Sequence, residues 1–312
     1  MSPALTLSAP AKLNLYLHIT GRRQDGYHLL DSLVAFTTLA DQVELSDDVA
    51  YQISASGPFA DALGTGDDNL ALKAARALGE RSGMARFARI NLVKNIPVAA
   101  GLGGGSADAA AVLYGLRQAW RLDRAPLVEI GAAIGADVPV CLESQPAFMK
   151  GVGDVLGPKV TLPEAGLLLV NPGVMLGTGA VFSAYDQALA AGPGEGGGEA
   201  DGEADREADR EEVRPRPALD PAPADAEALA RALAGTGNDL TKAALGLAPE
   251  IGTLLESIAS ADGCRLARMT GSGPTCFGLF DDEAAADAAA REIGRAAPQY
   301  WCWAGGLRAG RA

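Results

Sequence analysis

A glycine-rich run at residues 97–107 is the segment best suited to bind a phosphorylated ligand. It reads Pro-Val-Ala-Ala-Gly-Leu-Gly-Gly-Gly-Ser-Ala. A short strand pattern ends at Val93 before it, and apolar residues recur at helical spacing from Ala109 to Trp120 after it. The glycines therefore lie where a helix begins, and the first turn of a helix carries unpaired N–H groups and a partial positive charge. Because glycine has no Cβ, a phosphate can approach this backbone closely.

Two common glycine motifs do not fit this run. A Walker loop requires a lysine before its Ser or Thr, whereas Gly105 directly precedes Ser106. A dinucleotide fingerprint counted from Gly101 requires glycine where Ser106 stands. A flexible connector is the remaining alternative, but four glycines within residues 101–105, next to a well-patterned helix, favour close approach of a ligand.

Polar residues alternate with apolar ones along residues 12–19. In a strand, Lys12 and Asn14 share one face with Tyr16 and His18, and the leucines occupy the other. Two residues along a strand span about 6.6 Å, so Lys12 and Asn14 can contact one small polar ligand. A half-solvated edge strand with a polar outer face is the alternative.

The turn after this strand ends in an aromatic residue and an imidazole. Tyr27 can stack on a flat base, and His28 can hydrogen-bond to it. This pair suggests that the ligand includes a base.

Length and composition predict a cytoplasmic protein of two domains. The chain has 312 residues, of which 48% are hydrophobic, and no apolar run approaches the length of a membrane span. The N-terminus lacks the regions of a secretory signal. The four cysteines form no CxxC pair and only two histidines accompany them, so neither a disulfide framework nor a zinc site is indicated.

The negative charge is concentrated in residues 192–225. This segment contains eleven acidic and four basic residues, a net charge of −7 out of −13 for the chain. It has few apolar side chains to offset the entropy of ordering, so we predict a disordered insertion, with a partner-binding acidic segment as the alternative. A chain this acidic is not expected to bind nucleic acid.

Strand and helix signals alternate and predict a mixed α and β fold. A boundary near Pro158 would give domains 1–158 and 159–312, with residues 192–225 as an excursion from the second. Helices are expected to begin near Ser106, Pro126 and Asn238, and another to include residues 251–258. Strands are expected at 5–7, 13–19, 43–45, 90–93, 166–170, 266–270, 275–280 and 301–307.

Five segments, 10–15, 21–28, 97–110, 135–139 and 270–273, together resemble the GHMP kinase family. The similarity covers nearly the whole chain apart from residues 192–225. It implies an α+β fold of two lobes, an N-terminal ATP-binding and catalytic lobe with a left-handed β-α-β unit and a C-terminal ferredoxin-like lobe. ATP and the substrate would meet between the lobes.

The resemblance implies a reaction as well as a fold. The segments around Lys12, Asn14 and Tyr27 are most similar to family members that act on a small cytidine diphosphate substrate. The implied activity is transfer of the γ-phosphate of ATP, with Mg²⁺, to the 2-hydroxyl of a methylerythritol unit in the non-mevalonate isoprenoid pathway. Asp137 takes the place of the catalytic acid/base and Lys12 that of its charged neighbour. A tertiary hydroxyl is a poor nucleophile, so a nearby carboxylate can accept its proton while an ammonium steadies the phosphoryl oxygens.

Each assigned role has a structural alternative. Aspartate is common in a turn at a helix end, which is the alternative for Asp137. Lys94 can be solvated, Phe182 can be a core residue, and glycines 271 and 273 can form a simple turn. No residue can be assigned as a second acidic metal ligand, so the metal ligands are unknown. Ser106 is the hydroxyl best placed for a phosphate or its Mg²⁺.

The resemblance also implies the binding residues. Substrate contacts fall on Asn14, Tyr27, His28, Thr178 and Phe182, and the loop at 271–273 closes over the site. Nucleotide contacts fall on Asn69, Leu70, Lys94, Pro97, Val98, Ala99, Ala100, Gly101, Leu102, Gly103, Gly104, Gly105, Ser106 and Ala107.

Two other functions are compatible with these residues. A homoserine- or mevalonate-type kinase of the same family would share the glycine-rich run but would not need Tyr27 and His28. A nucleotide-binding sensor of the same fold would lack turnover, against which the presence of both Lys12 and Asp137 argues. We expect a small-molecule substrate, no membrane or nucleic acid partner, and a monomer or weak homodimer.

Overall fold

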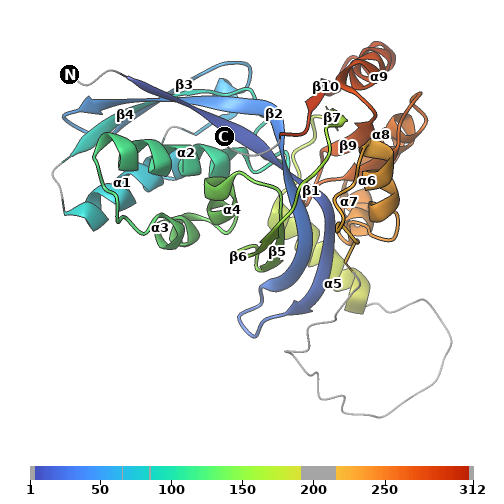
Figure 1. Ribbon diagram of the computed structural model, residues 1–312, viewed down its shortest axis with the longest axis horizontal. Coiled ribbons are helices and arrows are strands. Elements are labelled where there is room, and N and C mark those ends of the chain that lie inside the picture. The colour runs from blue at the N-terminus through green and yellow to red at the C-terminus, as the bar shows by residue number, and fades with distance from the viewer. Residues whose placement is uncertain (1–3, 65, 84–85, 191–215, 309–312) are drawn as a thin grey trace.

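The first lobe is a six-stranded sheet with four helices on one side (Figure 1). The computed structural model describes residues 4–64, 66–83, 86–190 and 216–308. The strand order is β3-β4-β2-β5-β6, with β1 paired to β2. Strands β3 and β4 are parallel and are joined through α1, which makes a β-α-β crossover. The elements of this lobe are β1 (Leu5–Arg22), β2 (His28–Asp48), β3 (Gln52–Ser56), the 3₁₀ helix η1 (Ala60–Ala62), α1 (Leu70–Ser82), β4 (Phe87–Val93), α2 (Gly104–Ala119), α3 (Leu127–Ile134), α4 (Val138–Glu143), β5 (Ala147–Gly151) and β6 (Val155–Lys159).

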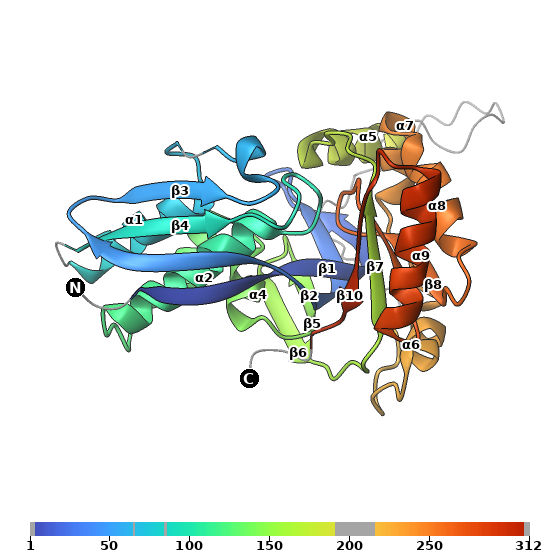
Figure 2. The ribbon, with the colours of Figure 1, turned by 90° about the horizontal axis from the view of Figure 1, so that it is seen from above.

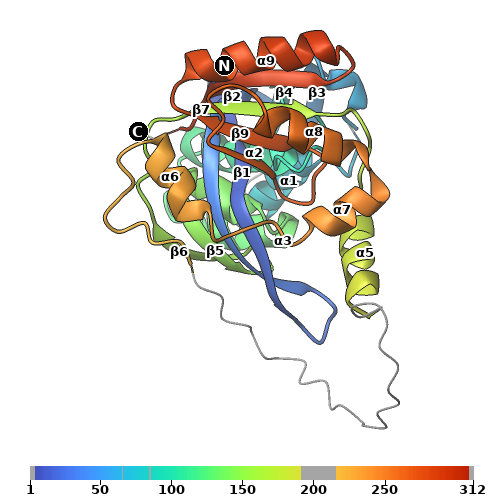
Figure 3. The same cartoon turned by 90° about the vertical axis from the view of Figure 1, so that its right-hand side faces the viewer.

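The hairpin of β1 and β2 runs through the centre of the molecule and reaches both lobes (Figure 3). Residues 9–20 of β1 are buried, so the alternative of a half-solvated strand with a polar outer face is wrong, although β1 pairs with β2 alone in the sheet. The pairing shifts register between Asn14 and Tyr16, which interrupts the expected alternation. As a result Leu17 lines the interlobe pocket with Lys12 and Asn14, while the Tyr16 hydroxyl donates to Asp31.

The second lobe is a four-stranded antiparallel sheet with the order β10-β7-β9-β8. Its β-α-β-β-α-β path and this strand order are those of a ferredoxin-like fold, as expected. Helices α8 and α9 cover the outer face of the sheet (Figure 2). The elements of this lobe are β7 (Gly166–Asn171), α5 (Thr178–Ala190), α6 (Ala226–Leu233), α7 (Thr241–Leu247), α8 (Glu250–Ala259), β8 (Leu266–Met269), β9 (Cys276–Phe280), α9 (Glu283–Ala296) and β10 (Trp301–Gly306).

The two lobes share a hydrophobic core. Leu13 and Leu15 of β1 pack in one buried cluster with Leu167 and Leu169 of β7. Leu168, between them, belongs to the cluster on the other face of the second sheet. Strand β7 is therefore buried on both faces, and its apolar side chains join the hairpin to the helices beyond it.

All eight expected strands lie within or overlap observed strands, but the sequence signals missed β3, β5, β6, α1, α4, α5, α6 and α9. The expected boundary near Pro158 falls inside β6, so the connection between the sheets begins after Lys159. All four cysteines are free. No helix among the described residues is long and apolar enough to cross a membrane.

The predicted disordered insertion at 192–225 falls partly outside the described residues, which resume at Arg216. For residues 216–225 the prediction is wrong. The Arg216 guanidinium donates to Asp31 at 2.8 Å and lies over the Phe148 ring, 4.7 Å from its centroid. Asp225 caps α6 by accepting a hydrogen bond from Ala228 N. These contacts fix the chain in place, and the composition of the segment did not indicate them.

Candidate active site

A pocket of about 820 Å³ lies between the lobes and collects most of the predicted site residues. One end is formed by the glycine-rich loop and the other by the tip of the β1–β2 hairpin and α5. Asn69 and Ala107 are not among its lining residues. The predicted residues that line it are Lys12, Asn14, Tyr27, His28, Leu70, Lys94, all of 97–106, Asp137, Thr178 and Phe182.

The glycine-rich loop turns through left-handed backbone conformations before α2 begins at Gly104. Gly101 has φ +74° and Gly103 has φ +64°. A Cβ on Gly101 would lie 2.8 Å from the carbonyl oxygen of Gly273, and one on Gly103 would lie 3.2 Å from Lys12 Cβ. The loop can therefore pack against β1 and the 270–273 loop only because it has no side chains at these positions.

The expected nucleotide contacts of Ala107 and Asn69 stay predictions, but both residues already use hydrogen-bonding groups within the protein. The Ala107 N–H donates to Gly103 O within the first helical turn, so it is not available to a phosphate. The Asn69 side chain caps α1, accepting from Ala71 N and donating to Gly64 O. Asn69 directly precedes Leu70, which lines the pocket.

Lys12 and Asp137 form an ion pair beside the glycine-rich loop. Lys12 Nζ lies 3.1 Å from Asp137 Oδ1, and the Lys12 N–H donates to Leu102 O at 2.8 Å. Lys12 is buried, whereas the Asp137 carboxylate is 34% exposed. Asp137 precedes α4 but its side chain makes no capping hydrogen bond, so the turn alternative does not account for it. An exposed carboxylate held by an ammonium can accept a proton from a bound hydroxyl.

Asn14 is held in one orientation at the side of this pair. Lys12 Nζ donates to Asn14 Oδ1 at 3.0 Å, and Asn14 Nδ2 donates to Ser32 Oγ at 2.8 Å. The Asn14 N–H donates to Thr270 Oγ1, which joins β1 to the second lobe. The amide therefore presents a fixed polar group to the pocket.

The other end of the pocket is built from both lobes. The His28 ring stacks on Phe182 of α5 with centroids 4.7 Å apart, and His28 Nε2 lies 2.7 Å from Asp186 Oδ1. Tyr27 is 64% exposed at the rim. The Thr178 hydroxyl contacts Ser272 Oγ at 3.0 Å, which brings the start of α5 to the 271–273 loop. Phe182 thus faces the pocket, although it also packs against the core of the second lobe.

Sequence reasoning missed Asp186, which lies four residues after Phe182 and so shares a helical face with it. It also missed Arg22, whose guanidinium lies 3.3 Å from the Asp186 carboxylate. The four-residue spacing from Phe182 would have indicated Asp186 only if a helix had been predicted over this segment.

Lys94 belongs to a buried cluster beneath the glycine-rich loop. Its ammonium binds Asp108 Oδ2 at 2.6 Å and also Asp41 Oδ2. All three side chains are buried, so the solvated alternative for Lys94 is wrong, while its contact with a nucleotide stays a prediction. Asp41 Oδ1 accepts from Asn95 N and Ile96 N, directly before the loop begins. Neither aspartate was predicted.

Electrostatics in this cluster are unbalanced, with one cation against two carboxylates. Burial raises the pKa of Asp108 to about 7, and the repulsion of Asp41 adds to this while Lys94 opposes it. Asp108 Oδ1 has no hydrogen-bond partner among the described residues. Lys94 holds together Asp41, which binds the backbone just before the glycine-rich loop, and Asp108 of α2, which follows the loop. The cluster therefore supports both ends of the loop.

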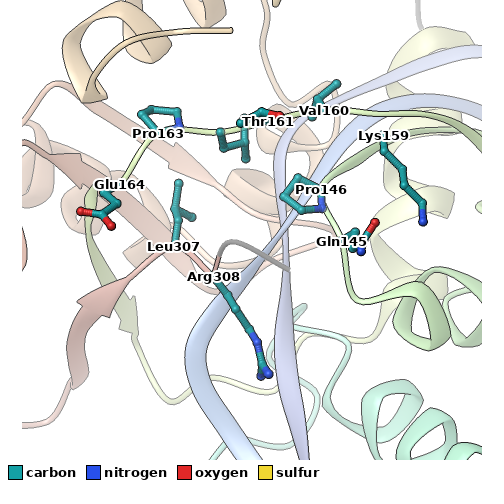
Figure 4. A pocket seen from close by; sticks show the side chains of 10 residues that line it. Gln145, Pro146, Lys159, Val160, Thr161, Pro163, Glu164, Leu307 and Arg308 are labelled. Atoms are coloured by element: carbon teal, nitrogen blue, oxygen red, sulfur yellow. The ribbon is translucent and has the colours of Figure 1, made fainter. Parts of the chain in front are cut away.

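A second cavity of about 260 Å³ lies where the chain passes from one lobe to the other (Figure 4). It is lined by residues 145–146, 159–164, Leu307 and Arg308. It contains none of the predicted site residues. The larger pocket is therefore the candidate active site.

Comparison with known proteins agrees with this geometry. Residues 69–145 match the GHMP kinases N terminal domain, and residues 219–299 match GHMP kinases C terminal. The 4-diphosphocytidyl-2-C-methyl-D-erythritol kinase of Paramagnetospirillum magneticum is 45% identical over 302 residues, 96% of each chain.

Solved structures extend the likeness to the fold. A crystal structure of 4-(cytidine 5'-diphospho)-2C-methyl-D-erythritol kinase has a TM-score of 0.73 and 32% identity, and the match covers 99% of this chain and 100% of that one. A homoserine kinase from Cytophaga hutchinsonii has a TM-score of 0.66 at 16% identity, with 99% and 96% coverage, and this likeness is one of fold alone. With both lobes matched and a relative this similar over nearly its whole length, the chain belongs to the GHMP kinase family.

Proposed function

We propose that this chain is a 4-diphosphocytidyl-2-C-methyl-D-erythritol kinase, which phosphorylates the 2-hydroxyl of its substrate with ATP. The observation that carries the proposal is the presence in one pocket of a glycine-rich loop, the Lys12–Asp137 pair and the Tyr27–His28 pair. The 45% identity to a kinase of that name supports the choice of substrate within the family.

The phosphate end of the pocket binds and orients the donor. The backbone N–H groups of residues 101–106 and the positive end of α2 stabilise the phosphate charge. Lys12, held by Leu102 O and Asp137, adds a cation where charge develops on the transferred group. Phosphoryl transfer depends mainly on such positioning and charge stabilisation.

Asp137 acts on the acceptor. The substrate hydroxyl oxygen forms a bond to the γ-phosphorus while the bond from that phosphorus to the bridging oxygen breaks, and ADP leaves with the electron pair. The hydroxyl proton passes to the Asp137 carboxylate. Asn14 orients the polar substrate beside this pair, because its amide is held by Lys12 and Ser32.

The base end holds the cytidine. Tyr27 and Phe182 offer aromatic faces for a pyrimidine, and His28 offers ring nitrogens. Since the base end and the phosphate end form one continuous pocket, the base anchors a substrate whose hydroxyl reaches Asp137.

The residues present fit Mg²⁺ as the accompanying ion. Mg²⁺ keeps several waters and is usually bound by one or two carboxylates together with substrate phosphates. The Ser106 hydroxyl and the Asp137 carboxylate line the same pocket, and among the described residues no group of three or more His, Cys, Asp or Glu forms a closed metal cage. When bound, the ion would neutralise charge on the phosphate oxygens.

Cellular context is part of the proposal. We place the enzyme in the cytoplasm as a monomer or weak homodimer that acts on a small molecule. Free cysteines fit a reducing compartment, and the acidic net charge disfavours nucleic acid.

A substrate panel tests the proposal. The protein is incubated with ATP and, separately, 4-diphosphocytidyl-2-C-methyl-D-erythritol, homoserine and mevalonate, and products are read by mass for one added phosphate. Phosphorylation of the cytidylyl compound alone, with ³¹P NMR placing the new group on the 2-hydroxyl, is the expected result. Preference for homoserine or mevalonate would instead identify another kinase of the family.

A further inference from the structure

Asp186 of α5 contacts two residues of the first-lobe hairpin at the mouth of the pocket. Its Oδ1 lies 2.7 Å from His28 Nε2, and its Oδ2 lies 3.3 Å from Arg22 Nη1. The His28 side chain is 9% exposed and Asp186 is 29% exposed. Both residues line the pocket, and the Asp186 carboxylate is directed at one defined ring nitrogen of His28.

This contact determines which His28 nitrogen carries a proton. An ionised carboxylate can only accept, so Nε2 must be the donor. In a neutral imidazole the other nitrogen, Nδ1, then has a lone pair and acts as an acceptor. A histidine without such a partner exchanges between its two tautomers.

The same helix also fixes the plane of the ring. Phe182 stacks on His28 at an interplanar angle of 25°, and Tyr185 meets it edge-on at a centroid distance of 6.1 Å. Phe182, Tyr185 and Asp186 all belong to α5, so one element of the second lobe sets both the orientation and the tautomer of a first-lobe histidine.

We propose that Asp186 is a positioning residue that determines base specificity. By keeping His28 Nδ1 as an acceptor, it favours a pyrimidine that donates from an exocyclic amino group, as cytosine does, over one with a carbonyl oxygen at that position, as in uracil. In this proposal Asp186, which also lines the pocket, acts on the base through His28. This inference rests on the proposed function, since it assumes that a cytidine lies against His28.

Nitrogen NMR tests the tautomer directly and independently of catalysis. The chain has only two histidines, so ¹⁵N-histidine labelling gives two sets of ring signals, and His28→Gln identifies the His28 set by its disappearance. At a pH where the ring is neutral, His28 is expected to show a bare Nδ1 and a protonated Nε2. In Asp186→Ala the two nitrogen shifts should move towards each other as both tautomers become populated. Wild-type His28 protonated on Nδ1, or shifts unchanged in Asp186→Ala, would overturn the proposal.

Binding measurements test the specificity. Calorimetry compares 4-diphosphocytidyl-2-C-methyl-D-erythritol with its uridylyl analogue in the wild type and in Asp186→Ala, Asp186→Glu and Gln187→Ala. The preference for the cytidylyl compound should fall at least about tenfold in Asp186→Ala, because an unmatched polar group discriminates strongly in a specific site. Asp186→Glu, which keeps a carboxylate, should retain part of the preference for the cytidylyl compound. Gln187 is exposed on the same helix and serves as the matched control.

The outcomes separate this inference from the proposed function. An equal loss of affinity for both compounds in Asp186→Ala would make Asp186 only a contact between α5 and the hairpin, and would overturn the inference. A wild type that binds the cytidylyl compound with the expected preference but transfers no phosphate would contradict the proposed function and leave the inference supported.

Discussion

The two ends of the interlobe pocket are built differently. At the phosphate end, the glycine-rich loop, Lys12 and Asp137 all come from the first lobe, and Lys12 is 4% exposed. At the base end, the hairpin tip of the first lobe meets α5 of the second, and Tyr27 is 64% exposed. The phosphate end therefore takes its loop and charged side chains from one lobe, with the 270–273 loop of the second lobe packed against Gly101, whereas the base end takes its side chains from both lobes.

This difference indicates at which end of the pocket substitutions can alter the choice of substrate. Around Gly101 the backbone has no free space, because a Cβ would collide with the Gly273 carbonyl oxygen. The base end includes the exposed side chain of Tyr27, which can be exchanged with little effect on the core, although Phe182 also packs against the core of the second lobe. We expect substitutions at the phosphate end to abolish turnover with any substrate, and substitutions at the base end to change which substrate is used.

The largest effect is expected from Asp137→Asn. The amide keeps the shape of the side chain but cannot accept the hydroxyl proton, so kcat should fall by about 10³-fold. A radiolabelled γ-phosphate assay measures this loss, and Glu129→Gln, on the exposed side of neighbouring α3, is the control. Unchanged transfer in Asp137→Asn would remove the aspartate from the mechanism.

Gly101→Ala tests the packing of the phosphate end. The new Cβ would be strained at φ +74° and would lie 2.8 Å from Gly273 O, so the loop must shift. We expect kcat/KM for ATP to fall by about 10²-fold, since misplacement of about 1 Å has such an effect, and stability to fall by about 1–3 kcal/mol.

Gly83→Ala is a matched control for this change. Gly83 has φ +64° at the C-cap of α1, but a Cβ added there would meet no atom of the described residues within 4 Å. The variant should lose about 1 kcal/mol of stability from backbone strain alone and keep its kcat/KM for ATP. Similar kinetic losses in both variants would mean that strain, and not the collision with Gly273, explains the effect.

The phosphate end was also the end that sequence could predict. Its residues are close in sequence or follow a strand period, so the sequence alone could place residues 97–106 together and pair Lys12 with Asn14. The expected strand alternation failed beyond Asn14. The register shift there reverses the faces of β1, and no local sequence pattern marks it.

Tertiary contacts explain what was missed. Asp41 and Asp108 lie 53 and 14 residues from Lys94, and only the fold brings the three together. Helix α5 was not predicted at all, so Asp186 had no helical face to be placed on. Residues 216–225 have a disordered composition, but Arg216 at their start contacts Asp31 and Phe148 from two distant segments, and Asp225 at their end caps α6.

Tyr27→Leu tests the exposed end. Loss of the ring should raise KM for the cytidylyl substrate about tenfold, because stacking of a base on an aromatic side chain contributes about 1–3 kcal/mol. The kcat and the KM for ATP should stay near the wild-type values, since the phosphate end is untouched. Phe87→Leu, another exposed aromatic residue at the start of β4, is the control. An equal rise in KM for ATP would show that the two ends are not independent.

The smallest effect on turnover is expected from Asp108→Asn, which acts instead on the pH dependence of stability. Burial raises the pKa of Asp108 to about 7, so the folded protein binds this proton more tightly than the unfolded chain does. The stabilisation from the proton is complete below the unfolded pKa of about 4 and is lost as the pH rises towards 7. Asparagine resembles the protonated carboxyl and leaves Lys94 paired with Asp41 alone.

Urea unfolding of wild type and Asp108→Asn at pH 4 and pH 8 measures this difference. The two proteins should be similarly stable at pH 4, and the variant should be more stable at pH 8 by up to about 4 kcal/mol. Asp123→Asn, in the exposed turn after α2, should follow the wild type at both pH values. Parallel pH profiles of stability for wild type and Asp108→Asn would mean that folding does not raise the pKa of Asp108. The cluster beneath the glycine-rich loop would then hold two ionised carboxylates around one ammonium. The contrast between a constrained phosphate end and an adaptable base end would in that case rest on the packing of the loop backbone alone.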